Sequence, residues 1–208
     1  MMPGSARSCP RWRAARDAGS VAWTSALDET YDIGAARGAL TLAACASLIA
    51  RAEAVGFTDA PVTTGMGFRM IPELRNNTRV MIDDLDLAAA LWDRLAPLFP
   101  ARQGAWRAVG LNERLRFYRY ESGQRFAWHR DGCFARDDHE RSRLTLMLYL
   151  NGDFDGGATE FDLDEPLSVK PEAGMALWFA HGVRHQGAEV TRGVKYALRT
   201  DVMYRREG

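Results

Sequence analysis

The alternation of residues 143–151 constrains the fold of this chain most. In the segment RLTLMLYLN, leucines occupy every second position: Leu144, Leu146, Leu148 and Leu150. The positions between them carry a hydroxyl, a thioether and a phenol: Thr145, Met147 and Tyr149. Successive side chains of a strand point to opposite faces. We therefore predict a strand whose leucine face packs beneath helices and whose other face lines the half-polar interior of a barrel.

From Leu115 onward the chain is divided by glycine and proline into short segments with strand character. The expected strands are 115–120, 126–131, 143–151, 159–161, 167–170, 175–179 and 195–204, and His185 is expected to precede a loop that runs to Gly193. Many short strands with such turns predict a jelly-roll barrel, a double-stranded β-helix, of about eight strands.

Two helices are predicted before the barrel. Thr41 can cap the first, which would end at Gly56, and its apolar residues form one stripe: Leu42, Cys45, Leu48, Ile49 and Ala52. The second would follow Asp83 and Asp84 and end before Pro100, with a leucine face: Leu87, Leu91, Leu95 and Leu98. The fold class is thus α+β and mostly β, with N-terminal helices packed on one face of the barrel.

Residues 1–25 differ from the rest in composition. Arginines predominate over acids there, and Pro, Gly and Ser separate them: Arg7, Arg11, Arg13 and Arg16 against Asp17. We expect a disordered extension, whose role is open, followed by a single domain over residues 26–208. Within that domain the helical support would cover about 40–100 and the barrel about 110–205.

Charge and cysteine content exclude several classes of protein. Among the 208 residues, Lys plus Arg and Asp plus Glu are both 27, so no overall charge attracts the chain to nucleic acid or to an anionic membrane. The three cysteines are scattered and form no CxxC pair, which fits a reducing compartment. No apolar run reaches the length of a membrane span. We expect a soluble, cytoplasmic protein without a nucleic-acid or membrane partner.

A candidate metal site lies in the expected strand 126–131. His129 and Asp131 are two residues apart and would share one face of that strand. A second histidine from a distant strand would complete a two-histidine, one-carboxylate site, which suits non-haem Fe(II). His185 is the candidate, and His181, four residues earlier, is the alternative.

Further candidates come from the last strand and from a polar loop. Lys195 and Arg199 share a face of the last strand; if that face is buried they need an anionic partner, and otherwise they are cations of an exposed edge. Arg75 and Asn77 lie in a polar loop between the helices, which either lines a substrate entrance or is a solvated connection.

Five blocks carry a resemblance to a known family. In chain order they are YESGQRFAWHRD, RLTLMLYLN, GGATEF, VKPEAGMALWF and HQGAEVTRGVKY. Together they resemble the prolyl 4-hydroxylase-like branch of the Fe(II) and 2-oxoglutarate-dependent dioxygenases, over about residues 115–204.

The resemblance implies roles for individual residues. His129, Asp131 and His185 would bind iron, and Tyr120 would hydrogen-bond 2-oxoglutarate. Lys195 would pair with the distal carboxylate of the same cosubstrate; Arg199, on the same face, either assists Lys195 or replaces it as the anchor. Thr145 would line the cosubstrate pocket, and Arg143 would lie on the substrate side. Trp128, beside His129, is either a substrate contact or a packing residue.

The implied reaction uses Fe(II), 2-oxoglutarate and O2, with ascorbate as reductant, and hydroxylates an unactivated C–H bond while releasing succinate and carbon dioxide. In related halogenases a small residue replaces the carboxylate ligand, so Asp131 favours hydroxylation. The substrate would be a small molecule or a residue of a protein.

Three alternatives and one question stay open. A nucleic-acid demethylase would share the iron site, and Arg199 and Arg205 resemble its paired arginines. A cupin-like binding module without catalysis would share the barrel, and a zinc hydrolase would share the ligands. The oligomeric state is undetermined.

Overall fold

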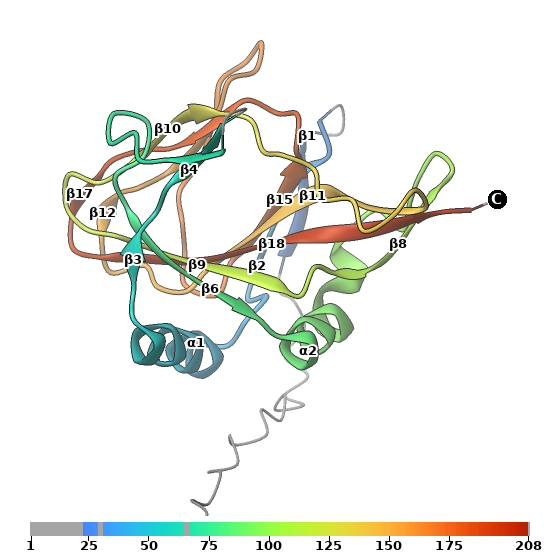
Figure 1. Ribbon diagram of the computed structural model, residues 1–208, viewed down its shortest axis with the longest axis horizontal. Coiled ribbons are helices and arrows are strands. Elements are labelled where there is room, and N and C mark those ends of the chain that lie inside the picture. Colours follow the sequence, from blue (N-terminus) through green and yellow to red (C-terminus); the bar gives the residue numbers. More distant parts are fainter. Residues whose placement is uncertain (1–22, 29–30, 65–66, 208) are drawn as a thin grey trace, which may run out of the picture.

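The computed structural model describes residues 23–28, 31–64 and 67–207. Two sheets face each other, and the two α-helices cover the outer face of the larger one (Figure 1). This arrangement confirms the predicted mostly β fold, a double-stranded β-helix with helices on one face. None of the helices in the described ranges is long and apolar enough to cross a membrane.

The major sheet contains ten strands of the described residues. Eight follow one another in the order β1 (Trp23–Asp28), β2 (Ile33–Arg37), β15 (Ala176–Ala180), β11 (Glu140–Tyr149), β18 (Lys195–Arg206), β9 (Arg114–Tyr120), β6 (Thr78–Asp83) and β3 (Thr58–Asp59). The other two are β7 (Arg102–Gln103) and β8 (Trp106–Leu111), and β8 pairs with the C-terminal part of β18. All of these pairings are antiparallel. In the strand order given above, β11 and β18 occupy the two central positions.

The minor sheet has four short strands and carries two of the expected metal ligands. Its order is β10 (Phe126–His129), β16 (His185–Gly187), β13 (Thr159–Phe161) and β14 (Leu167–Val169). Two ribbons complete the strands: β12 (Asp155–Gly156) with β17 (Val190–Arg192), and β4 (Val62–Thr64) with β5 (Gly67–Arg69).

The helices begin at the predicted caps. In α1 (Leu42–Val55) the Thr41 hydroxyl accepts a hydrogen bond from the Ala44 amide at 3.2 Å. In α2 (Leu85–Leu95) the Asp84 carboxylate accepts one from the Leu87 amide at 2.8 Å, and the short 3₁₀ helix η1 (Ala96–Leu98) follows. Each cap satisfies an amide that would otherwise lack a partner at the helix start.

The two faces of β11 separate two cores, as the alternation predicted. The leucine face packs with buried residues of both helices: Cys45, Leu48, Leu87, Leu91 and Leu95. On the other face Tyr149 belongs to the core between the sheets, with Met147 packed against it. The barrel interior is therefore lined from β11 by Thr145, Met147 and Tyr149.

Some sequence predictions need correction. Strand β1 begins at Trp23, so the last three residues of the expected extension 1–25 lie in the major sheet, and residues 1–22 lie outside the described residues. The expected loop from His185 to Gly193 contains β16 and β17. Strand β10 ends at His129, so Asp131, which was expected within a strand over 126–131, lies beyond the observed strand. These strands are short, and each depends on a partner far away in the sequence.

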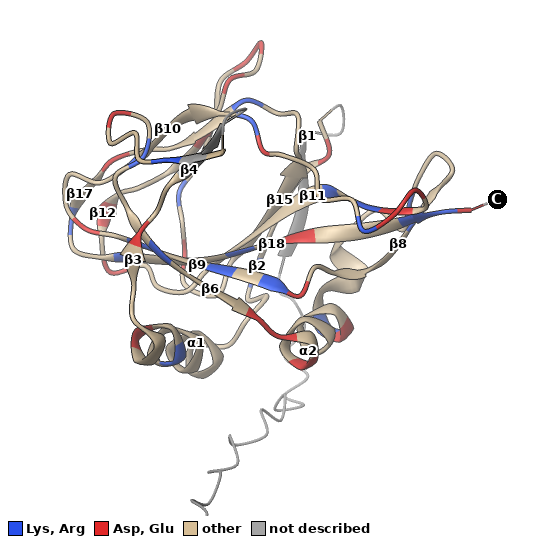
Figure 2. Cartoon of the chain, in the orientation of Figure 1, with Lys and Arg blue, Asp and Glu red and all other residues tan. Residues whose placement is uncertain are grey.

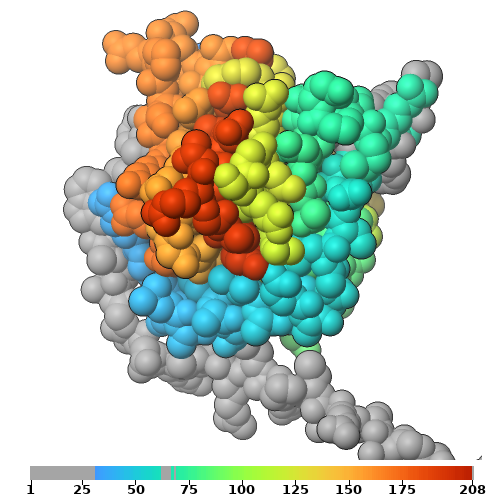
Figure 3. Space-filling model, turned by 90° about the vertical axis from the view of Figure 1, so that its left-hand side faces the viewer, coloured from blue at the N-terminus to red at the C-terminus, as the bar shows by residue number. Residues whose placement is uncertain are grey.

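Distant segments of the chain meet beside the barrel. The Asn76 amide donates to the Arg125 carbonyl at 3.4 Å, and the Gly123 amide donates to the Val190 carbonyl at 2.8 Å. In the side view the green, yellow-green and red segments that contain these residues lie next to one another (Figure 3). Basic and acidic residues are interspersed along the elements (Figure 2), in keeping with the equal numbers of each sign.

Candidate active site

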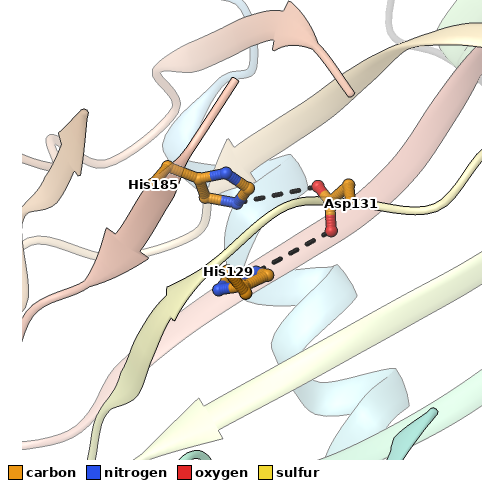
Figure 4. Close-up of side chains that lie close together, drawn as sticks. All are labelled: His129, Asp131 and His185. Atoms are coloured by element: carbon orange, nitrogen blue, oxygen red, sulfur yellow. Dashed lines mark ion pairs between the residues drawn. The ribbon is translucent and has the colours of Figure 1, made fainter. Parts of the chain in front are cut away.

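Three predicted ligands converge at the open end of the barrel. His129 ends β10 and His185 begins β16, and the two residues are paired across these strands. Asp131 follows two residues after His129, held by a hydrogen bond from its amide to the His181 carbonyl at 3.0 Å. One nitrogen or oxygen of each residue lies within 4.8 Å of the others. Figure 4 shows both imidazoles turned toward the carboxylate.

The histidine rings are oriented by their own backbone. Nδ1 of His129 lies 2.7 Å from the Ala127 carbonyl, and Nδ1 of His185 lies 3.0 Å from the Val183 carbonyl. A carbonyl only accepts, so in both rings Nδ1 carries the proton and Nε2 keeps a free lone pair. Nε2 of His129 lies 3.8 Å from Oδ1 of Asp131, and Nε2 of His185 lies 3.7 Å from Oδ2. Both free nitrogens thus face the carboxylate.

Burial keeps both imidazoles neutral. It lowers the pKa of His129 to about 4, with a further contribution from the nearby His185. It also lowers the pKa of His185, against an opposing effect of Asp131. Only a neutral imidazole has a lone pair to offer a metal. At neutral pH both rings are therefore in the ligating form.

Asp131 is held in place by two donors on one oxygen. The Thr145 hydroxyl donates to Oδ2 at 2.7 Å, and Nη2 of Arg199 lies 3.2 Å from the same oxygen. Burial opposes ionisation of this carboxyl, but Arg199 and the two histidines outweigh burial and hold its pKa below the usual range. Asp131 is therefore an anion, and its orientation is fixed by Thr145 and Arg199.

The alternative ligand His181 is engaged elsewhere. Its Nδ1 lies 2.9 Å from the Thr145 hydroxyl, and its Nε2 lies 2.8 Å from the Ser142 hydroxyl. Both ring nitrogens thus have hydrogen-bond partners, and neither faces the cluster. The structure brings together His129, Asp131 and His185, and places His181 behind them.

A pocket opens beside the three ligands. Besides them, its lining consists of Tyr118, Tyr120, Phe126, Met147, Thr159, Phe179, Gly187, Lys195 and Arg199. The predicted cosubstrate residues Tyr120, Lys195 and Arg199 therefore share one cavity with the ligand cluster. Most of the other side chains are apolar, so the polar groups are few and converge on one space.

Lys195 is a buried cation without an acidic partner in the described part of the chain. Its side chain donates to the Gly157 carbonyl at 2.6 Å, and its ammonium lies 5.3 Å from the Tyr120 ring centroid and 5.4 Å from that of Tyr149. Burial lowers its pKa to about 7. A buried ammonium with spare donors is a ready partner for the carboxylate of a ligand.

Arg199, in contrast, already has partners within the protein. Its Nη2 lies 3.2 Å from a carboxylate oxygen of Asp131 and 3.2 Å from one of Asp201, whose other oxygen lies 3.3 Å from Arg116. Although burial disfavours its charge, these carboxylates raise the pKa of Arg199 above the usual value. Arg205, which supported the demethylase alternative, pairs with Glu140 at 2.6 Å. Both arginines thus pair with carboxylates of the protein, whereas Lys195 forms no ion pair within the described residues.

Thr145 occupies a place that differs from the one expected, whereas the substrate-side role of Arg143 stays a prediction. Thr145 was expected to line the cosubstrate pocket, but its hydroxyl supports Asp131 and His181 instead. Arg143 lies outside this pocket, in a neighbouring cavity, where its Nε donates to the Gln103 side chain at 2.6 Å. The alternation of β11 predicted which side chains face the interior. It could not predict which polar side chain on that face would hydrogen-bond a metal ligand.

The three weaker substrate-side candidates do not line the pocket either. The Trp128 ring packs under Arg184, 5.2 Å from its guanidinium. Arg75 is buried, with its guanidinium 4.5 Å from the ring centroids of both Tyr118 and Phe126, and its Nε donates to Asn77 at 2.7 Å. Arg75 thus contacts Tyr118 and Phe126, two aromatic side chains that line the pocket, and Asn77 accepts a hydrogen bond from Arg75.

The sequence analysis did not identify Tyr118, which lines the pocket, or Asp201, which pairs with Arg199. Strand parity could have found both, because Tyr118 shares a face with Tyr120, and Asp201 shares one with Lys195 and Arg199.

The donor set fits a particular kind of metal. Two neutral imidazole nitrogens and one carboxylate on one side of a cavity form the facial arrangement of non-haem Fe(II) oxygenases. The pocket beside it, with Lys195 as an unpaired cation, fits a cosubstrate that bears a carboxylate. These residues can hold a metal and an acidic ligand side by side.

The same segment of the chain matches a family model. Residues 115–200 match the model described as the 2OG-Fe(II) oxygenase superfamily, where 2OG denotes 2-oxoglutarate. No curated protein matches the sequence.

Solved structures with the same fold cover most of the chain. A prolyl-4-hydroxylase from Pseudomonas putida is 23% identical, with a TM-score of 0.62 over 86% of this chain and 95% of that one. A prolyl hydroxylase from Trichoplax adhaerens, solved with a peptide of hypoxia inducible factor, is 14% identical, with a TM-score of 0.66 over 82% and 83%. A viral collagen prolyl hydroxylase from Paramecium Bursaria Chlorella virus-1, solved with 2OG, is 19% identical, with a TM-score of 0.57 over 84% and 96%.

The fold, the ligand cluster and the match over residues 115–200 are together similar to those of the 2OG-Fe(II) oxygenases of the double-stranded β-helix fold. The predicted resemblance to the Fe(II) and 2-oxoglutarate-dependent dioxygenases is confirmed over residues 115–200.

Proposed function

We propose that this protein is an Fe(II)- and 2-oxoglutarate-dependent dioxygenase that hydroxylates an unactivated C–H bond of an amino-acid-like substrate. The observation that carries the proposal is that Lys195, a buried cation without an acidic partner in the described residues, lines the same pocket as His129, Asp131 and His185. The substrate is a free amino acid, a small natural product or a residue of a protein. A peptide is bound in one solved structure of this fold.

Each side chain has a role in this proposal. His129, Asp131 and His185 would hold Fe(II) through two Nε2 atoms and one carboxylate oxygen, while Thr145 and Arg199 keep Asp131 oriented. Lys195 would bind the distal carboxylate of 2-oxoglutarate, and Tyr120 would close the same end of the pocket. When bound, iron and 2-oxoglutarate supply, together with O2, the oxidation that releases succinate and carbon dioxide.

The first test is succinate formation from 2-oxoglutarate with Fe(II), O2 and ascorbate, without added substrate. We expect slow uncoupled turnover by the full chain. Turnover should be lost in His129→Ala, Asp131→Ala and Lys195→Ala, because the first two remove metal ligands and the third removes the cation that faces the cosubstrate. His139→Ala is the matched control, because His139 is exposed in the loop before β11.

Two results would contradict the proposal. One is turnover that survives all three substitutions. The other is a wild-type protein that binds neither Fe(II) nor 2-oxoglutarate, which would favour a binding module without catalysis. Zinc rather than iron after anaerobic purification would support the hydrolase alternative.

A further inference from the structure

A second cavity lies next to the ligand cluster and has no role in the proposal above. It has a volume of about 250 Å³. The lining residues that matter here are Asp32, Gln103, Cys133, Arg141, Arg143 and His181. A water molecule needs roughly 10–15 Å³ of such space, so this cavity has room for a small organic molecule. It shares no lining residue with the pocket of Lys195 among the residues that the structure describes.

Short hydrogen bonds connect this cavity to Asp131. His181, in the cavity wall, has its Nδ1 2.9 Å from the Thr145 hydroxyl, and that hydroxyl donates to Asp131 at 2.7 Å. The Asp131 amide in turn donates to the His181 carbonyl at 3.0 Å. Cys133, also in the wall, follows Asp131 by two residues. A molecule bound in the cavity against His181 would therefore be connected to a metal ligand through two successive hydrogen bonds.

Two arginines of β11 give the cavity a positive wall. Arg141 and Arg143 are two residues apart on one strand, and their guanidinium carbons lie 4.8 and 5.6 Å from the centroid of the Trp106 ring. Nε of Arg143 donates to Gln103, while Nε of Arg141 is buried and has no hydrogen-bond partner. Within the described ranges, no carboxylate forms an ion pair with either residue.

The neighbouring arginines make this lack of partners informative. Arg136 and Arg205 pair with Glu140, and Arg107 pairs with Glu207. Carboxylates are thus plentiful at this end of the molecule, yet none reaches Arg141 or Arg143. A guanidinium presents several donors in a plane that matches a carboxylate, and the Trp106 ring holds both guanidinium groups in place.

The opposite sign is also present in the lining. Asp32 accepts a hydrogen bond from Nε2 of Gln103 at 2.7 Å, and the Oε1 atom of the same Gln103 accepts from Arg143 at 2.6 Å. The carboxylate of Asp32, the amide of Gln103 and the guanidinium of Arg143 therefore follow one another along the cavity lining, joined by hydrogen bonds. Such a row complements a molecule that carries an ammonium and a carboxylate.

We propose that this cavity binds the carboxylate of the oxidised substrate, a small acid of the free amino-acid type. Arg141 and Arg143 bind its carboxylate, and Asp32 faces its ammonium. The inference rests on the proposed function and narrows it, because it selects a free small acid over a residue within a protein chain.

Binding can be measured without turnover by saturation-transfer NMR on the full-length chain. The probes are the L-amino acids and their carboxamides, with saturating 2-oxoglutarate present so that Lys195 is occupied. We expect signals from one or more free acids and none from the matching carboxamides. Arg141→Gln with Arg143→Gln should weaken binding at least tenfold, and Arg107→Gln should leave it unchanged because Arg107 faces solvent and pairs with Glu207.

An acid that binds should also stimulate succinate formation, and the double variant should raise the KM for that acid. Equal binding of acid and carboxamide, no binding by any acid, or stimulation only by end-blocked peptides would each overturn the inference. Binding that depends on Arg141 and Arg143 in a protein that never turns over 2-oxoglutarate would uphold the anion site and refute the proposed oxygenase, so the two failures are distinct.

Discussion

The burial of Lys195 suits the binding of an acidic ligand but lowers the stability of the ligand-free protein. Its side chain is 3% exposed, and a carbonyl and two aromatic rings are its neighbours. Burial lowers its pKa from the ordinary lysine value of 10.5 to about 7. Below pH 7 the lysine is charged in both the folded and the unfolded protein, and its burial lowers the free energy of unfolding by the full desolvation cost. Between pH 7 and 10.5 only the unfolded chain keeps the proton, so the free energy of unfolding rises with pH over that range.

The same pKa predicts how 2-oxoglutarate affinity depends on pH. Below pH 7 Lys195 is protonated and attracts the carboxylate, and above pH 7 binding must also take up a proton. We expect the dissociation constant to be flat below pH 7 and to rise by up to about tenfold per pH unit above it. Calorimetry on the Mn(II)-loaded protein between pH 6 and 9, in buffers of different ionisation enthalpy, measures both the affinity and the proton uptake.

Lys195→Arg is the control for this titration, because a guanidinium stays protonated over the whole range. Its affinity for 2-oxoglutarate should show no rise in dissociation constant between pH 7 and 9. A wild-type profile as flat as that of the variant would mean that Lys195 is not the anchor.

Thr145 is expected to act on the metal through Asp131. Thr145→Val keeps the shape of the side chain and removes the donor that lies 2.7 Å from the carboxylate. Loss of a partner that orients a metal ligand typically weakens metal binding about 10- to 100-fold. Mn(II) affinity, followed by electron paramagnetic resonance, should fall by that amount.

Thr200→Val is the matched control for loss of a buried hydroxyl. Thr200 is fully buried in β18, and its hydroxyl donates to the Asn112 carbonyl at 2.6 Å, away from the ligand cluster. Both variants should lose about 1 kcal/mol of unfolding free energy, and only Thr145→Val should lose metal affinity. Equal Mn(II) affinity in both variants would show that Asp131 needs no support from Thr145.

At the scale of elements, β11 separates the supporting core from the active site. Leu144, Leu146 and Leu148 are fully buried against the helical layer, while Thr145 and Met147 face the barrel interior. Substitutions on the two faces should therefore have different consequences. One face determines stability, and the other determines ligand binding.

Leu146→Ala tests the supporting face. Removal of a fully buried leucine side chain leaves a cavity and typically costs about 2–5 kcal/mol of unfolding free energy. Urea unfolding should show that loss, while the folded fraction keeps its 2-oxoglutarate affinity. Met81→Ala, at a position 47% exposed on β6, should change the unfolding free energy by less than about 0.5 kcal/mol. A Leu146 variant as stable as the Met81 variant would refute this assignment of the face.

Elements with strong local signals could be predicted from the sequence. Both helices begin at the predicted caps, and the alternation of β11 gave both of its faces. Elements defined by pairing could not: β6 lies partly in a segment expected to be a loop, and it exists because it pairs with β9. Likewise the bond from Asp131 to the His181 carbonyl joins residues 50 positions apart, and no local pattern encodes it.

The candidate site shows the same division at the scale of the whole molecule. The resemblance supplied His129, Asp131, His185 and Lys195, and the structure brings all four to one pocket. Whether Lys195 or Arg199 is free to bind a carboxylate depends on Asp201 and Asp131, which the fold places beside Arg199. Such pairings follow from the three-dimensional arrangement of side chains, so residue type alone left the choice open.

Strands β1 and β2 form a ribbon that extends the major sheet beyond β15, and β2 pairs directly with β15. Gly34 of β2 is paired with Trp178 of β15, and a Cβ at Gly34 would lie 2.2 Å from the Trp178 ring. Trp178 is 5% exposed and packs edge-on against Phe99, so its ring has little freedom to move away. Glycine is therefore required there for the ribbon to dock.

Gly34→Ala should consequently destabilise the molecule as a whole. Overpacking of this kind costs about 1–3 kcal/mol, and since β15 is bonded to β11, the loss should shift a single cooperative transition. Thermal unfolding followed by far-UV circular dichroism and by release of Mn(II) should give one lowered midpoint for both signals. Gly110→Ala, in β8 with no atom near its would-be Cβ, should keep the wild-type midpoint. A Gly34 variant that unfolds like wild type, or that loses the ribbon while Mn(II) stays bound to the same temperature, would show that the ribbon is independent of the barrel.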